Sequence, residues 1–242
     1  QSTAVVVVPE SGQAFLIQSA SVTIKNINII PTLALGSVDY GVDVDARYVA
    51  LSSVSVQDPL GKITTAGVRI SSLAYVSYSS ITVNNVPGLV IVGSGTVVSH
   101  SSAVTTNAFK PALWLDGASS NTVTGGHISN LASAGYGAYL SNYANGNTIS
   151  QSTMIGGSGY YGLYINGSAS NSVTGSYIGN QADNGFGAYL YSNANYNTIS
   201  QSTITVNTLS TYPALVIALS SFNIVTGSLL SNRGAAAKII NS

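Results

Sequence analysis

The stretch NTVTGGHISNLASAGYGAYLSNYANGNTISQST (121–153) returns as NSVTGSYIGNQADNGFGAYLYSNANYNTISQST (171–203), with 21 of the 33 aligned positions identical. A shorter unit repeats inside each copy. Its marker is an asparagine that recurs every 24 to 26 residues, at Asn121, Asn147, Asn171, Asn197 and Asn223. A fixed period of this size predicts one supersecondary unit stacked many times along the chain.

Two apolar residues five positions apart accompany each unit and extend the repeat over almost the whole chain. They recur at steps of 22 to 27 residues, as Val22/Ile27, Val49/Val54, Val76/Ile81, Val98/Ala103, Val123/Ile128, Ile149/Met154, Val173/Ile178, Ile199/Ile204 and Val225/Leu230. A second run such as GVDV (41–44) or GLYI (162–165) follows each pair, and its alternation favours strands. The intervals hold too few residues for a crossover helix, so we expect parallel coils stacked at about 4.8 Å.

The motif N-[TS]-[VI]-[TS]-x-x-x-[IM], followed by G-x-Y-[LI], resembles the repeats of right-handed parallel β-helix proteins. This group includes pectate-lyase-like enzymes, NosD-type periplasmic proteins and phage tailspikes. The resemblance implies an all-β fold, a single right-handed β-solenoid of about nine coils over residues 20–242. Residues 1–19 are expected to form an N-terminal strand, a cap or a segment that pairs with a partner. The motif reports coil geometry and carries no chemistry of its own.

The repeated positions have structural roles in such a fold. The second and fourth residues of G-A-Y-L point inward and should form aliphatic columns through the core. The two members of each apolar pair can both face inward only if the chain bends between them, at Gly125, Gly175 and Gly227 or at Gln-Ser 151–152 and 201–202. The recurring asparagines occupy a turn, where stacked amides can form an asparagine ladder.

Composition limits the possible partners. Charged residues make up only 6% of the chain, with seven acids and seven bases, so there is no basic surface typical of nucleic-acid binding. No apolar run approaches the roughly 20 residues that span a membrane. The chain has no cysteine and begins at Gln1, which suits a secreted protein whose signal peptide has been removed. We therefore expect an extracellular or cell-surface location.

One outward column of the second strand is aromatic over four consecutive coils, at Trp114, Tyr139, Tyr164 and Tyr189. Stacked rings can stabilise neighbouring strands without any further role. They can also form a contact for another protein or for a carbohydrate. These four residues are the candidate partner or glycan contact, and the three interpretations stay open at this point.

The signal for an enzyme is weak. Of the seven acids only Asp39, Asp43 and Asp45 cluster, and Asp43 shares a column with Arg69, so an ion pair between coils accounts for them. The two histidines fall on different coils, and there is no phosphate loop, metal-ligand spacing or nucleophile motif. The sequence therefore predicts no catalytic residue, no metal site and no cofactor. Asn166 begins the one N-x-[ST] sequon, Asn166-Gly-Ser168, and is a possible glycosylation site.

The ends of the solenoid lead to a functional hypothesis. The apolar segment Ala4, Val5, Val6, Val7, Val8 and Pro9 can pair with a strand edge. The last coil ends in GAAAKIINS, with no helix to cover it and no charges beyond Arg233 and Lys238. We expect a secreted, non-catalytic structural β-solenoid that self-assembles head to tail as a homo-oligomer, in an extracellular filament or surface layer. The alternative is a β-helix that binds or cleaves a polysaccharide, as a spike or lyase-like domain does.

Overall fold

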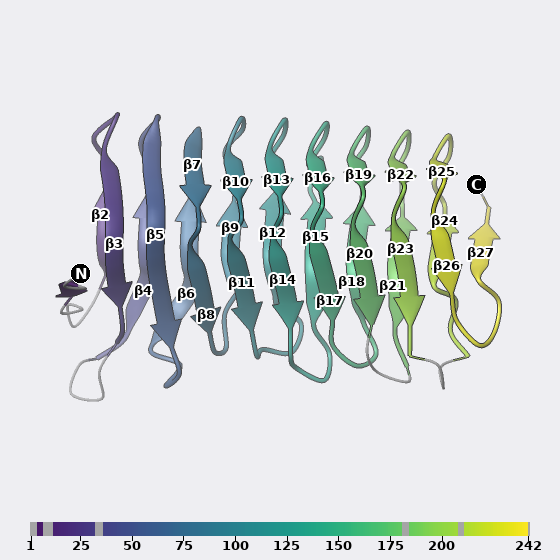
Figure 1. Ribbon diagram of the computed structural model, residues 1–242, viewed down its shortest axis with the longest axis horizontal. Helices are drawn as coiled ribbons and strands as arrows, with labels where there is room; N and C mark the ends of the chain where they lie inside the picture. Colours follow the sequence, from purple (N-terminus) through teal and green to yellow (C-terminus); the bar gives the residue numbers. More distant parts are fainter. Residues whose placement is uncertain (1–3, 7–11, 32–35, 181–183, 208–210, 242) are drawn as a thin grey trace.

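The computed structural model describes residues 4–6, 12–31, 36–180, 184–207 and 211–241, which form a rod of stacked β-strands (Figure 1). The described residues contain no helix. Every strand pairing is parallel, and the rod has about nine turns. The two ends of the chain lie at opposite ends of the rod (Figure 1). The predicted parallel β-solenoid is therefore confirmed.

Two sheets run the length of the rod, and each turn of the chain contributes to both. The first sheet has 17 strands: β1 (Ala4–Val6), β3 (Thr23–Ile29), β5 (Val49–Asp58), β7 (Ala74–Ser77), β8 (Ser80–Val83), β10 (Val97–Ser99), β11 (Ser102–Thr105), β13 (Thr122–Thr124), β14 (His127–Asn130), β16 (Thr148–Ser150), β17 (Thr153–Gly156), β19 (Ser172–Thr174), β20 (Tyr177–Asn180), β22 (Thr198–Ser200), β23 (Thr203–Val206), β25 (Ile224–Thr226) and β26 (Leu229–Ser231). The second sheet has 10 strands: β2 (Gln13–Ile17), β4 (Val38–Val44), β6 (Ile63–Ile70), β9 (Leu89–Ile91), β12 (Pro111–Asp116), β15 (Tyr136–Ser141), β18 (Tyr161–Asn166), β21 (Phe186–Tyr191), β24 (Leu215–Ala218) and β27 (Ala237–Ile240).

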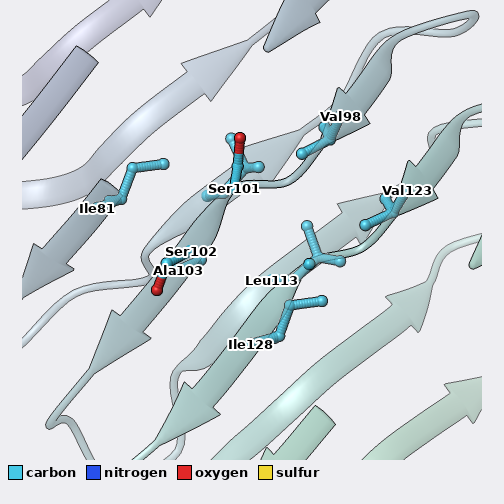
Figure 2. Close-up of a pocket in the computed structure, with 10 residues that line it drawn as sticks. Ile81, Val98, Ser101, Ser102, Ala103, Leu113, Val123 and Ile128 are labelled. Carbon is cyan, nitrogen blue, oxygen red and sulfur yellow. The ribbon is translucent and has the colours of Figure 1, made fainter. Parts of the chain in front are cut away.

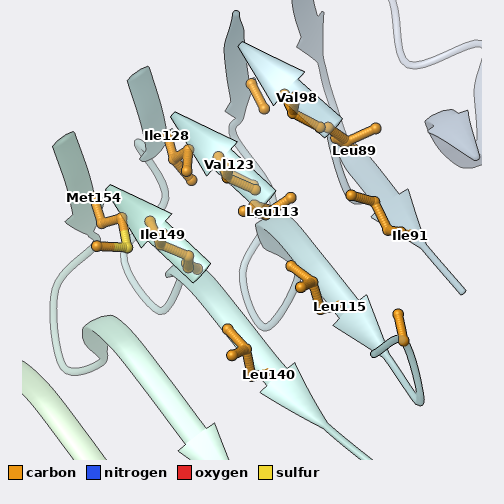
Figure 3. Close-up of a cluster of buried hydrophobic side chains, with 14 of the residues drawn as sticks. Leu89, Ile91, Val98, Leu113, Leu115, Val123, Ile128, Leu140, Ile149 and Met154 are labelled. Carbon is orange, nitrogen blue, oxygen red and sulfur yellow. The ribbon is translucent and has the colours of Figure 1, made fainter. Parts of the chain in front are cut away.

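The core consists of aliphatic columns contributed by both sheets. Val98, Val123 and Ile149 of the first sheet face Leu113 and Leu140 of the second (Figure 3). All are buried, and equivalent residues of successive turns pair directly, as predicted for this part of the chain. Burial of such columns is the main favourable contribution to the stability of the rod.

The register predicted for the first two turns is wrong by two residues. Ile24 pairs with Leu51, and Leu51 with Val76, so the pairs equivalent to Val76/Ile81 are Ile24/Ile29 and Leu51/Val56, although Val49 and Val54 are also buried in the core. Because apolar residues alternate in β5, a shift by two residues presents an equally apolar face, and the sequence pattern does not separate the two frames. Val49 instead occupies the turn position that later turns give to asparagine, and it is fully buried.

The asparagine ladder is confirmed. Asn121, Asn147, Asn171 and Asn197 are buried, and the Oδ1 atom of each of the last three accepts the backbone N–H and the Nδ2–H of the asparagine one turn before, at 2.8–3.0 Å. These bonds satisfy amides that the turn removes from water. The ladder therefore both closes the turn and fixes the register between turns.

The predicted bend in the first sheet occurs where expected. The bend residue has a positive φ in every turn, at Gly125, Gln151, Gly175, Gln201 and Gly227 and at the earlier Asn26, Ser53, Tyr78 and His100. The next residue is a serine in most turns, and its hydroxyl accepts the equivalent backbone N–H of the preceding turn. The amides of Ser152 and Ser176, for example, donate to Ser176 and Ser202 at 3.2 Å. This second ladder is not apparent from the repeat alone.

Close approach of the two sheets requires one column of very small residues. Its ten members lie just before the inward position of the second sheet and are all glycine or alanine: Ala14, Gly41, Gly67, Gly88, Ala112, Gly137, Gly162, Gly187, Ala214 and Ala236. A Cβ at Gly137 would lie 2.4 Å from the carbonyl oxygen of Gly162. The backbone of the adjoining turn thus occupies the space of a side chain.

At the first end of the rod, β1 adds to the first sheet by pairing Ala4–Val6 with Ile27–Ile29 of the same chain. Val7, Val8 and Pro9, the rest of the predicted assembly segment, lie outside the described residues. The strand β2 pairs with β4 in the second sheet. Residues of the predicted N-terminal segment therefore continue the same ladders as the rest of the rod.

A small internal cavity of about 10 Å³ lies where the core column of the first sheet carries Ala103 (Figure 2). The equivalent residues one turn before and after are Ile81 and Ile128. Val98 and Leu113 also line the cavity. Because an empty apolar space removes dispersion contacts from its lining, this turn is less well packed than its neighbours.

Filling this cavity is expected to stabilise the rod. Ala103→Val should raise the free energy of unfolding by about 1 kcal/mol, because the added methyl groups occupy existing space. Ala138→Val is the matched control: Ala138 is also fully buried but does not line this cavity, so overpacking should cost about 1–3 kcal/mol. Urea unfolding followed by circular dichroism measures both changes. Equal effects of the two substitutions would show that the cavity has no energetic consequence.

Candidate functional site

The outer face of the second sheet carries an aromatic surface on β12, β15, β18 and β21. The strand register places Trp114, Tyr139, Tyr164 and Tyr189 on consecutive turns, as predicted. A second column lies three residues earlier on the same strands and consists of Tyr136, Tyr161 and Phe186. We call these seven residues the aromatic surface.

Rings of the aromatic surface stack on one another along the rod. Tyr139 lies between Trp114 and Tyr164, with ring centroids 6.1 and 5.0 Å away and planes tilted by 13° and 10°. The second column interleaves with the first, since Tyr161 stacks on Tyr164 at 4.8 Å and on Tyr189 at 5.2 Å. The rings of successive turns therefore stack on one another, and each such pair adds to the stability of the sheet.

This arrangement limits what the four predicted contact residues can bind. Packing of a sugar ring on an aromatic residue needs a free ring face. Tyr139 and Tyr164 each have a stacked neighbour on the turn before and on the turn after, so both of their faces are covered. What they present to solvent is the ring edge and the hydroxyl group. The column thus offers hydrogen-bonding groups in place of a flat apolar platform.

Two further tyrosines, Tyr160 and Tyr212, stand nearly perpendicular to the stacks. Tyr160 contacts Tyr136 at 4.8 Å with an angle of 84°, and Tyr212 contacts Phe186 at 5.1 Å with an angle of 83°. Neither residue was singled out by the sequence analysis. A signal for them was present in the sequence. The position just before the strand of the second sheet alternates between a large side chain and glycine, as Lys110, Gly135, Tyr160, Gly185 and Tyr212 in successive turns.

Four phenols of the aromatic surface have a raised pKa and so resist ionisation. Burial, followed by the repulsion of Tyr189 and Tyr160, raises the pKa of Tyr161 to about 12. Burial and neighbouring phenols also raise the pKa values of Tyr136, Tyr164 and Tyr189. The free phenol titrates near 10, so these hydroxyls are neutral throughout the physiological range. They can both donate and accept hydrogen bonds.

Side chains at the margin of the aromatic surface hold it in place. The indole N–H of Trp114 donates to Ser141 Oγ at 2.9 Å. Asn166 Nδ2 donates to the Tyr139 hydroxyl at 3.4 Å. Ser168, the third residue of the predicted sequon, is buried, donates to the Asn166 carbonyl oxygen and accepts the Ala144 amide. Glycosylation of Asn166 stays a prediction.

The acidic cluster is an ion pair between turns, as expected from the sequence. Arg69 Nη1 lies 2.9 Å from Asp43 Oδ1, and the Asp43 carboxylate is almost fully buried. The guanidinium also lies 5.7 Å from the ring centre of Tyr40. Asp58, which is buried, accepts the amides of Lys62 and Ile63 at 2.8 Å and closes a loop. Both carboxylates therefore have structural partners.

In the part of the chain that the structure describes, no group of three or more His, Cys, Asp or Glu residues could hold a metal ion. His100 stacks on Tyr78, with ring centroids 5.2 Å apart. A search of the same residues for a helix long and apolar enough to cross a membrane finds none.

Comparison with known proteins gives one family match. The family model described as "Periplasmic copper-binding protein (NosD)" matches residues 49–238, and no curated protein matches the chain. Similar solved structures include the Dettilon tailspike protein gp208 (13% identity, TM-score 0.41, 95% of this chain and 61% of that one). Pectate lyase Pel9A is 14% identical, with a TM-score of 0.46 over 89% of this chain and 60% of that one. The Azotobacter vinelandii mannuronan C-5 epimerase AlgE6 A-module is 10% identical, with a TM-score of 0.38 over 99% of this chain and 90% of that one. The chain thus spans about three fifths of the first two proteins.

Proposed function

The chain belongs to the NosD family of parallel β-helix repeat proteins, and we propose that it is a non-catalytic structural rod that acts outside the cytoplasm and assembles end to end. The periplasmic description of the family and the scarcity of charged residues support a location outside the cytoplasm. Such assembly would produce an extracellular filament or a surface layer.

The observation that carries the proposal is the last turn of the rod. Ile239 belongs to a core column in which Ile217 is 6% exposed, yet Ile239 itself is 67% exposed. Ile239 and Phe222 line an open hollow of about 130 Å³ together with Asn223. Asn223 ends the asparagine ladder, and its Nδ2 atom is buried without a hydrogen-bond partner. An additional turn would cover the apolar side chains and supply the missing acceptor.

The opposite end offers a matching edge. Among the described residues, β1 pairs with Ile27–Ile29 of β3, and no described strand pairs with Thr23–Lys25 on the side away from β5. Both ends therefore present edges of the same two sheets. The last turn of one copy can continue into the first turn of another by the same parallel ladder, and this head-to-tail contact propagates unless a rotation closes it. Strand addition at such an edge is a common mode of recognition.

The family description names copper, but the donor set of this chain does not fit a copper centre. Copper(I) prefers thiolate and thioether ligands, and copper(II) prefers imidazole. The chain has no cysteine, and its one methionine, Met154, is fully buried in the aliphatic core. Its two histidines are in different turns, and His100 stacks on Tyr78. No copper chemistry is therefore proposed for this chain.

Charge at the exposed end is expected to abolish assembly. Ile239→Asp places a carboxylate where the next copy would pack. The variant should therefore sediment as a monomer at concentrations at which the unmodified protein assembles end to end. Leu131→Asp is the matched control, because Leu131 is also 67% exposed but lies in the middle of the rod. Analytical ultracentrifugation and negative-stain microscopy measure the outcome. A wild-type protein that stays monomeric at high concentration would overturn the proposal.

A second candidate function is polysaccharide binding along the rod. It is favoured by the perpendicular rings of Tyr160 and Tyr212, which extend the aromatic surface toward solvent. This candidate does not require end-to-end assembly, and the two functions are compatible in one molecule.

A further inference from the structure

Tyr160 and Tyr212 occupy equivalent places two turns apart. Each contacts an aromatic ring of the preceding turn, Tyr136 or Phe186, at about the same distance and angle. Two turns of a parallel β-solenoid correspond to about 10 Å along the rod. The structure therefore holds two similarly oriented rings at a fixed separation along one face.

The rings recur only in every second turn because the equivalent positions of the alternate turns, Gly135 and Gly185, have no room for a side chain. A Cβ at Gly135 would lie 1.9 Å from Asn130 Cγ, and one at Gly185 would lie 2.0 Å from Asn180 Nδ2. Asn180 Nδ2 in turn donates to the carbonyl oxygens of Gly157 and Tyr160, at 2.6 and 2.8 Å. The buried asparagine thus both excludes a side chain from its own turn and holds the loop that carries Tyr160.

The perpendicular orientation leaves ring surface for a ligand. Tyr136 stacks on Tyr139 and Tyr161 at 5.2 and 5.8 Å, whereas Tyr160 stands at 84° to Tyr136 and is partly exposed. Tyr212 is 41% exposed, and Phe109, which contacts Tyr160 at 5.4 Å, is 62% exposed. The tyrosine hydroxyls of the adjoining stack lie beside these rings. Flat apolar faces next to hydrogen-bonding groups match the surface of a pyranose, which has apolar C–H faces and hydroxyls at its rim.

We propose that Tyr160 and Tyr212, extended by Phe109, bind a neutral, extended β-1,4-linked polysaccharide that runs along the rod. In such a chain successive sugars are turned over, so the same sugar face recurs at every second residue, a repeat close to two turns of the solenoid. Residues 111–207 contain no Lys, Arg or Glu and only two Asp, and Lys110, next to Phe109, is a single cation that does not match the regularly repeated carboxylates of a polyuronate. The inference rests on the second candidate function and identifies its ligand class.

Binding of hexasaccharides, measured by isothermal titration calorimetry, tests the proposal. Cellohexaose, mannohexaose and xylohexaose are the neutral β-1,4 probes; hexagalacturonate and maltohexaose are the acidic and α-linked comparisons. At least one neutral β-1,4 hexamer should bind and its disaccharide should bind at least tenfold more weakly, because only the longer chain reaches both rings. Tyr160→Leu and Tyr212→Ala should each weaken binding about fivefold to tenfold. Tyr143→Ala, at a 78% exposed tyrosine in a different turn, is the control.

The outcomes separate this inference from the functions on which it depends. Loss of binding in Trp114→Ala but not in Tyr160→Leu or Tyr212→Ala would keep the second candidate function and overturn this assignment. Binding of hexagalacturonate or maltohexaose in preference to the neutral β-1,4 hexamers would overturn the ligand class. No binding of any of the five hexamers would overturn both the ligand class and the second candidate function. The monomeric Ile239→Asp variant should bind the hexamer as the unmodified protein does, so assembly and glycan binding are tested independently.

Discussion

Replacing Gly162 by alanine is expected to lower the free energy of unfolding by about 3 kcal/mol or more, although it adds only one methyl group. The new Cβ would lie 2.6 Å from the carbonyl oxygen of Gly179, 2.9 Å from its amide nitrogen and 2.9 Å from the carbonyl oxygen of Gly187. These are backbone atoms of two sheets, which cannot rotate away as a side chain can. Relief of the overlap requires displacement of whole strands, which would disturb the ladders on both sides.

The control lies in the same column of small residues. Ala112→Gly removes a methyl group from a turn in which alanine already fits, so it should cost only about 1 kcal/mol. Urea unfolding followed by circular dichroism and by the fluorescence of Trp114, the one tryptophan of the chain, measures both variants. If Gly162→Ala costs no more than Ala112→Gly, backbone contact between the sheets does not exclude a side chain at this position.

The second large effect is expected at the asparagine ladder, where Asn147→Ala should cost about 3 kcal/mol. Asn147 Oδ1 accepts the backbone N–H and the Nδ2–H of Asn121 at 2.9 and 3.0 Å, and its Nδ2 donates to Ala118 O and Asn171 Oδ1 at 2.8 and 3.0 Å. Truncation leaves several of these buried groups without a partner. Each unsatisfied group costs about 1–3 kcal/mol, which outweighs the modest net value of a hydrogen bond.

Asn145 in the same turn provides the matched comparison. Its side chain is partly exposed, and its Oδ1 accepts a bond from the Ala169 amide. Water can replace this bond, so Asn145→Ala should cost about 1 kcal/mol or less. The same urea experiment distinguishes the two variants. Equal losses of unfolding free energy in the two variants would mean that burial of the ladder amides does not increase their contribution to stability.

The ladder, the bend and the aromatic column were all predictable because the residues that form each of them recur at one fixed point of a regular period. The register of residues 121–203 follows from Asn121 and its successors, since a polar residue that must lie in the turn excludes a shifted frame. The first two turns lack this marker. There Val49 and Leu51 alternate within one strand, both frames are apolar, and the prediction chose the wrong one.

The sequence by itself determined the architecture: a repeat of 22–27 residues with inward aliphatic positions can bury its apolar side chains only by stacking, so it specifies a rod, its ladders and the aromatic column. Only the tertiary structure decided which ring faces that column leaves free. Stacked neighbours cover both faces of Tyr139 and Tyr164, while Tyr160 and Tyr212 stand across the stack. Ring orientation depends on the neighbours above and below, including glycines that make room for buried asparagines. These contacts join residues from different turns, and no local pattern in the sequence specifies them.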